Sequence, residues 1–337
     1  MTSQSLGLLR EETDQHGTTE MMACGLEEAR ARLAEPDAAI DSQSPFDRCA
    51  RVGLPQDRVT VSKDMYLSFL TTQVMEWDDF EIDQLTKIIE SLRPVFAGIG
   101  MDLPDRVWLI KTTGREEAAA AYTRGFDTVA LPSNMVASLM ELPQGGDSLH
   151  PAHSSAYLAD IITHELFHIM SKNNPSIRAE LYSELGFKEL TAPLDFPHDI
   201  APSGLPYSAL KITNPDAPLL NVSINLRPSA GTTEVAMVPA LVSRTPYVGG
   251  AFFETLEWIF FELDNTGSSW QRDKKGRVIV RQSGPLMPQY YAKIGRNLSE
   301  ELFHPDEILA QSFVIAAKEP SLRLLTCLSD TIWPEKR

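Results

Sequence analysis

The sequence predicts an α+β fold, in which a helix with a metal-binding motif lies beside a small sheet and precedes an antiparallel β segment and C-terminal helices. Residues 154–172 contain neither Gly nor Pro, have helical spacing and hold a His-Glu-x-x-His motif. Two short runs with strand character, Arg106–Lys111 and Phe126–Leu131, precede this helix. Apolar or alternating runs separated by turns follow it between residues 219 and 281.

The chain is expected to divide into a tail and two parts. Residues 1–45 are polar, with helical spacing only at Leu26–Leu33, and this composition predicts a disordered tail or a propeptide-like cover. Residues 46–175 form the expected N-terminal α/β part with the motif helix. Residues 176–337 form the expected C-terminal part with a β meander and the late helices.

The elements before the motif follow from apolar spacing. Helices are predicted at Lys63–Glu76 and Asp78–Leu92, and a short helix at Glu116–Ala121 lies between the two strands. The second strand, Phe126–Leu131, has two interpretations that its spacing leaves open. It either lies along a cleft and offers backbone groups to an extended peptide, or it is simply a core strand.

The motif helix has clear boundaries. Ser154 and Ser155 suit its N-terminus, and Asn173-Asn174-Pro175 is expected to end it. The residues that flank or lie inside the motif are apolar, which indicates a buried helix: Leu166, Phe167, Ile169 and Met170. After it, helical spacing returns at residues 176–189, 286–300 and 305–318.

The motif predicts a zinc site. His164 and His168 are four residues apart, so their imidazoles share one helix face and are able to bind one Zn²⁺. Glu165, beside the first histidine, is placed to act as general base on a zinc-bound water. The competing interpretation is a helix with two surface histidines, which predicts charged or small neighbours rather than the apolar ones present.

Composition argues against several kinds of partner and against a disulfide-stabilised fold. Hydrophobic residues make up 43% and charged residues 23%, as in ordinary globular proteins, and the net charge of −16 argues against nucleic acid and anionic membrane surfaces as partners. The three cysteines are too scattered for a disulfide framework. Because neither a secretory signal nor a membrane-spanning stretch is visible, we expect a cytoplasmic protein, with signal-independent secretion as the alternative. The oligomeric state is left open.

A catalytic zinc takes a third protein ligand. None of the other histidines follows the motif at the short spacing of a third-histidine site: His16, His150, His153, His198 and His304. His304 is a weaker possibility because it precedes a helix, so a carboxylate is favoured. Glu180 and Glu184 lie one turn apart on the next helix, and Glu307 lies in the first turn of a late helix that begins with Pro305. Spacing favours Glu307 and leaves the other two open.

Scattered blocks between residues 45 and 320 resemble a group of little-characterised bacterial zinc metallopeptidase-like proteins of the gluzincin class. The blocks are His164 to His168, Asn174-Pro175, Arg178, Leu181-Tyr182, Gly186-Phe187, Ala121 to Gly125, Ile294 to Asn297 and His304 to Ala310. The resemblance implies a zincin-like fold, and it implies Glu307 as the third zinc ligand. Gln311 stands where gluzincins often carry an acid one turn later, which leaves open how the ligands are supported.

We therefore expect a zinc metallopeptidase that hydrolyses peptide bonds in a peptide or protein substrate by a zinc-activated water. The alternatives are a non-catalytic zinc-binding protein and a hydrolase of non-peptide amides. Candidate donors to the developing oxyanion are Tyr290, Tyr291 and His304, and candidate substrate contacts are Tyr122 and Arg124. Each of these five side chains is equally open to a purely structural role.

Overall fold

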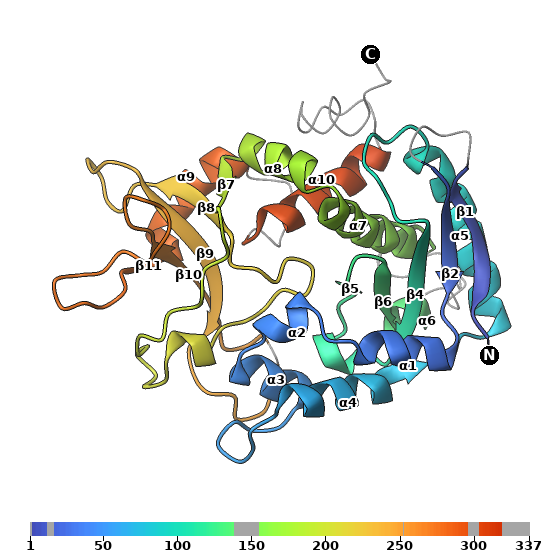
Figure 1. Cartoon of the computed structure of the whole chain (residues 1–337), viewed down its shortest axis with the longest axis horizontal. Helices are drawn as coiled ribbons and strands as arrows, with labels where there is room; N and C mark the ends of the chain where they lie inside the picture. The colour runs from blue at the N-terminus through green and yellow to red at the C-terminus, as the bar shows by residue number, and fades with distance from the viewer. Residues whose placement is uncertain (1, 12–16, 138–154, 252, 296–302, 319–337) are drawn as a thin grey trace, which may run out of the picture. The chain divides into compact units, whose positions relative to one another are not determined.

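The computed structural model describes residues 2–11, 17–137, 155–251, 253–295 and 303–318 (Figure 1). Within these ranges it is a mixed fold of helices and two sheets, which confirms the predicted α+β class. By its internal contacts the chain forms two compact units. Unit 1 comprises residues 1–37, 67–178 and 309–337, and unit 2 comprises residues 38–66 and 179–308.

Unit 1 is built on a sheet in the order β1-β2-β4-β6-β5, with β3 also paired to β4. The pairings β2–β4 and β4–β6 are parallel, and the others are antiparallel. The strands are β1 (Gln4–Arg10), β2 (Thr19–Ala23), β3 (Val74–Met75), β4 (Arg106–Thr112), β5 (Tyr122–Arg124) and β6 (Thr128–Pro132). Because β6 pairs on both sides, the predicted second strand is an inner strand of the core, and β5 ends the sheet.

Two long helices of unit 1 pack together on this sheet. α5 (Asp79–Phe96) contacts β1 and α7, and α7 (Ser155–Asn173) contacts β5 and β6. α5 begins where Asp78 and Glu81 form a reciprocal capping box, which satisfies backbone N–H groups of the first turn. Shorter elements complete the unit: α1 (Leu26–Ala34), the part of α4 (Lys63–Gln73) from Leu67 on, the 3₁₀ turn η1 (Arg115–Glu117) and α6 (Ser133–Ala137). In the described ranges, no helix has both the length and the apolar character that crossing a membrane requires.

The predicted disordered tail is wrong for the residues that form β1, β2 and α1. β1 and β2 pair with each other, and β2 continues the sheet through Met21, which is paired in parallel with Val107 of β4. Leu6 and Leu9 of β1 are fully buried. Polar composition gave the wrong prediction because β2 is stabilised by β4, a partner far along the chain, and β1 adds to the sheet through β2. Local hydrophobicity does not report such pairing.

Unit 2 contains the predicted β meander. Its strands pair antiparallel with their neighbours in sequence, in the order β11-β10-β9-β8-β7. The elements are α2 (Ala38–Ser42), α3 (Pro45–Val52), β7 (Phe187–Glu189), the 3₁₀ turn η2 (Tyr207–Ala209), β8 (Val222–Leu226), β9 (Val235–Ser243), β10 (Leu256–Glu262), β11 (Val280–Gln282) and α9 (Ser283–Ile294). α9 packs on β8 and β10, and its Tyr290 is fully buried.

Three of the described helices belong partly to each unit. In α4, the residues up to Tyr66 belong to unit 2 and the rest to unit 1. In α8 (Pro175–Glu184), the residues up to Arg178 belong to unit 1 and the rest to unit 2. In α10 (Pro305–Lys318), the residues up to Ile308 belong to unit 2 and the rest to unit 1. The unit 1 part of α10 is fixed by Phe313, whose ring centroid lies 5.7 Å from that of Phe96 in α5 and 5.6 Å from that of Phe167 in α7.

Candidate metal centre

α7 brings the two motif histidines together. The Nε2 atoms of His164 and His168 are 3.1 Å apart, and the ring centroids are 4.8 Å apart. His168 is fully buried, whereas His164 is partly exposed. The predicted apolar neighbours, Leu166, Phe167, Ile169 and Met170, are all fully buried. The histidines therefore lie on a packed helix, and the interpretation of a solvated helix with two surface histidines is wrong for His168.

The histidine pair fits a tetrahedral zinc ion. Two imidazole nitrogens bound to one tetrahedral Zn²⁺ at about 2.0–2.1 Å lie about 3.3–3.4 Å from each other. The observed separation of 3.1 Å between the two Nε2 atoms is close to that value. At this distance two N–H groups would oppose each other, so at least one Nε2 must present its lone pair, as a metal ligand does.

The C-terminal end of the motif helix is held in place by Asn174. Its Oδ1 accepts from the backbone N–H of Asp102 at 2.9 Å, and its Nδ2 donates to the carbonyls of Asp102 and Met170, both at 2.8 Å. The helix ends at Asn173, within the predicted stop Asn173-Asn174-Pro175, while Ser154 lies outside the described residues. These bonds satisfy carbonyl and N–H groups at the helix end and fix the direction of α7.

Glu165, the predicted general base, is also buried on α7, with 4% of its surface exposed. It follows His164 directly in the chain and occupies the same turn of the helix. A carboxylate enclosed in this way exchanges protons with bulk water less readily than one on the surface. The position therefore suits a group that takes up a proton and returns it to the same substrate.

Glu307 lies in the first turn of α10, with 2% of its surface exposed. The backbone N–H of Asp306 donates to Nδ1 of His304 at 3.1 Å, and its carboxylate accepts from the Tyr182 hydroxyl at 2.7 Å. Oε1 of Glu307 accepts a hydrogen bond from Nδ2 of Asn214 at 2.5 Å. The helix start predicted at Pro305 is confirmed, and a network of unit 2 side chains fixes its first turn.

The two competing glutamates lie in a different environment. Glu180 and Glu184 are both exposed on α8, whose buried side is formed by Leu181 and Tyr182. A ligand to a catalytic zinc must lie in a site that limits access of water, so a buried carboxylate is the better candidate. Burial thus distinguishes Glu307 from the other two, which spacing alone did not.

The remaining candidates have structural contacts. Tyr290 packs against Trp258, with ring centroids 4.9 Å apart, and burial raises the pKa of its hydroxyl well above the usual range. The Tyr122 hydroxyl donates to Oε1 of Glu116 at 3.4 Å. Arg124 donates to Oδ2 of Asp37 at 2.7 Å and to the Glu35 carbonyl at 2.6 Å. For Tyr290, Tyr122 and Arg124, the structural role is the one these contacts support.

Two of the other histidines, His198 and His304, lie in the described part of the chain, and both have contacts within unit 2. Nδ1 of His198 lies 2.9 Å from the Ser208 hydroxyl on the surface of unit 2, and His304 caps α10. The other three histidines lie outside the described residues, as does the end of the block Ile294 to Asn297: His16, His150, His153 and Arg296-Asn297.

Sequence reasoning missed Asn214. It lies in an irregular segment, Thr213-Asn214-Pro215-Asp216, whose composition indicates only a turn. Its amide is distant in sequence from the Glu307 carboxylate that it contacts, and no local pattern reports that pairing. Only the folded unit 2 identifies it as a neighbour of a candidate ligand.

Comparisons of this chain with protein-family models, with curated proteins and with solved structures found no match. The resemblance to zinc metallopeptidases therefore stays a prediction.

Proposed function

We propose that this protein is a zinc-dependent metallopeptidase of gluzincin type, with His164, His168 and Glu307 as zinc ligands and Glu165 as general base. The observation that carries the proposal is the pair of Nε2 atoms 3.1 Å apart on a buried helix, with a glutamate directly after the first histidine. A site with only a structural role has no use for that glutamate, whereas a hydrolase requires a proton acceptor there.

The setting of Glu307 within unit 2 supports it as the third ligand. Its side chain is buried, with 2% of its surface exposed. One carboxylate oxygen is held by the Asn214 amide, and the neighbouring Asp306 is held by the Tyr182 hydroxyl. A buried carboxylate with a fixed orientation suits a metal ligand better than an exposed and mobile one.

Each residue has a defined task in the proposed reaction. When bound, a zinc ion supplies Lewis-acid polarisation of a carbonyl group and makes water a stronger acid. Glu165 accepts a proton from the attacking water at a carboxylate oxygen and delivers it to the nitrogen that leaves. His164 and His168 present nitrogen lone pairs, and the buried surroundings of His168 keep other water away.

The position of β5 supports a peptide as substrate. β5 is the end strand of the unit 1 sheet, where it pairs with β6, and α7 packs against both strands. An end strand offers backbone N–H and C=O groups that an extended peptide is able to pair with. The sequence suggested this pairing role for the second predicted strand, but that strand is the inner strand β6, so we assign the role to β5. The cytoplasmic location and the exclusion of nucleic-acid and membrane partners stay predictions from composition.

The proposal predicts about one zinc per chain and zinc-dependent cleavage of a peptide library. Zinc content is measured on the purified protein, and cleavage is measured by mass spectrometry before chelation, after it and after zinc is restored. Loss and return of cleavage support the proposal. One zinc per chain without cleavage of peptides supports the non-catalytic zinc protein, and cleavage of other amides alone supports the non-peptide hydrolase. A protein that binds no zinc overturns all three.

The choice of the third ligand is tested by zinc affinity. Glu307→Gln removes the carboxylate charge with little change of shape, and we expect zinc binding to weaken by at least about 100-fold. Glu180→Gln and Glu184→Gln change exposed positions on α8 and are expected to bind zinc within twofold of the original protein. Affinity is measured by competition with a chromophoric chelator. If zinc affinity falls in either α8 variant and is unchanged in Glu307→Gln, the third ligand is the glutamate of α8 instead.

A further inference from the structure

The segment that carries Asn214 is tied to α3 by a buried charged cluster within unit 2. The carboxylate of Asp47 accepts from the Thr213 backbone N–H at 3.1 Å and from its hydroxyl at 2.8 Å. Arg51 completes the connection by donating to the Thr213 carbonyl at 2.8 Å. Every polar group of Thr213 is thus bonded to α3, which fixes the backbone that leads into Asn214.

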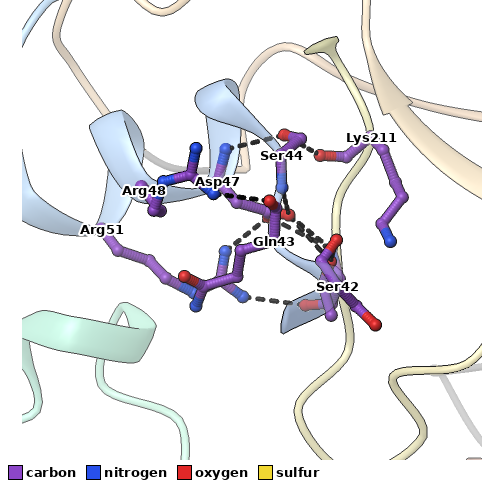
Figure 2. Close-up of polar contacts among 8 residues, drawn as sticks. Ser42, Gln43, Ser44, Asp47, Arg48, Arg51 and Lys211 are labelled. Atoms are coloured by element: carbon purple, nitrogen blue, oxygen red, sulfur yellow. Dashed lines mark hydrogen bonds and ion pairs between the residues drawn. The ribbon is translucent and has the colours of Figure 1, made fainter. Parts of the chain in front are cut away.

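The cluster is internally satisfied, which makes it rigid. Arg51 and Asp47 form an ion pair at 2.5 Å with side chains 2% and 0% exposed. Asp47 also closes a capping box with Ser44, and the Ser44 hydroxyl donates to the Lys211 carbonyl at 2.6 Å (Figure 2). Figure 2 shows these α3 side chains gathered against the segment that carries Lys211. Buried charges persist only with such complete partners, so the segment has little freedom to move.

The amide of Asn214 is oriented by its two contacts. Its Oδ1 accepts from the backbone N–H of Asp216 at 2.9 Å, and its Nδ2 donates to Oε1 of Glu307 at 2.5 Å. A carboxamide has one accepting and one donating end, so the bond to Asp216 places the donating end toward the glutamate. The orientation follows from the hydrogen bonds on both sides.

We infer that Asn214 is a positioning residue for the metal ligand Glu307, and that the Asp47–Arg51 cluster sets its place. The inference rests on the proposed function, because it requires Glu307 to bind zinc. A neutral amide holds one carboxylate oxygen by a hydrogen bond and leaves the negative charge of the group for the metal. A lysine or arginine at that place would compete with the metal for the same charge. The choice of an uncharged donor therefore fits a ligand.

The test replaces the donor by an acceptor of nearly equal shape. In the full chain, Asn214→Asp opposes two carboxylates, and we expect the affinity for Zn²⁺ to fall by about 10–100-fold. With Co²⁺ as probe, the visible absorption spectrum should change, because it reports the arrangement of the ligands. Asn225→Asp, at an exposed position of β8, adds the same charge to the same unit and serves as the control. The control is expected to bind both metals as the original protein does.

Further variants keep the result decisive. Asn214→Ala removes the donor without adding charge and should also lower the affinity for Zn²⁺. Its metal-free form should unfold at nearly the same urea concentration as the metal-free control. Thr213→Val removes the hydroxyl bonded to Asp47 and should give a smaller weakening. Unchanged zinc affinity and cobalt spectrum in Asn214→Asp and Asn214→Ala would overturn the inference while leaving the proposed function intact. Failure of the original protein to bind zinc would overturn both.

Discussion

Glu165→Gln is expected to reduce peptide cleavage by about 10²–10⁴-fold while the zinc content of the protein stays unchanged. Glutamine has nearly the shape of glutamate but takes up no proton at neutral pH, so the variant removes the proposed proton transfer alone. Glu165 is not one of the proposed ligands, and its buried place on α7 is preserved by an isosteric side chain. Cleavage rates are measured on a peptide identified from the library, and zinc is measured on the same preparation.

Zinc content separates the possible outcomes for Glu165. Glu180→Gln makes the same chemical change at an exposed position of α8 and should leave both cleavage and zinc content unchanged. Cleavage in Glu165→Gln at more than about a tenth of the original rate would contradict the general-base role. Loss of zinc together with loss of cleavage would instead show that Glu165 supports the metal, and the proton acceptor would have to be found elsewhere.

The motif helix was predictable because its determinants are local. The spacing of His164 and His168 depends only on helix geometry, and the Nε2 atoms meet as that geometry requires. Apolar residues around the motif predicted burial, and Asn173-Asn174-Pro175 predicted the helix end. The β meander was predictable for the same reason, since each of its strands pairs with the next one along the chain.

Features that depend on distant partners were not predictable. Residues 4–10 and 19–23 have too little apolar alternation to identify them as strands. Residues 19–23 are stabilised by pairing with β4, far along the chain, and residues 4–10 pair with residues 19–23. The exposure of Glu180 and the burial of Glu307 also result from packing, so spacing could not choose between them. Asn214 acts through a hydrogen bond to a residue distant in sequence, and a single sequence without an alignment contains no trace of it.

The largest effect on stability is expected for Asp47→Ala, which should lower the free energy of unfolding by about 3–5 kcal/mol. The substitution leaves the Arg51 guanidinium buried without its ion-pair partner and removes the acceptor of the Thr213 N–H and hydroxyl. It also opens the capping box of α3. Urea unfolding, followed by circular dichroism with the slope and midpoint fitted separately, gives the free-energy difference.

An exposed ion pair of the same unit serves as a control, because it shows whether burial causes the large loss of unfolding free energy in Asp47→Ala. Nζ of Lys63 lies 2.6 Å from Oδ1 of Asp41, but both side chains are largely exposed. Asp41→Ala should therefore lower the free energy of unfolding by less than about 1 kcal/mol. Replacing both buried charges, as in Asp47→Leu with Arg51→Met, should cost less than Asp47→Ala alone, since no charge is then left without a partner. A double variant as unstable as the sum of its two single variants would mean that the ion pair adds nothing. The hydrogen bonds of Asp47 to Thr213 would then account for the stability of the cluster.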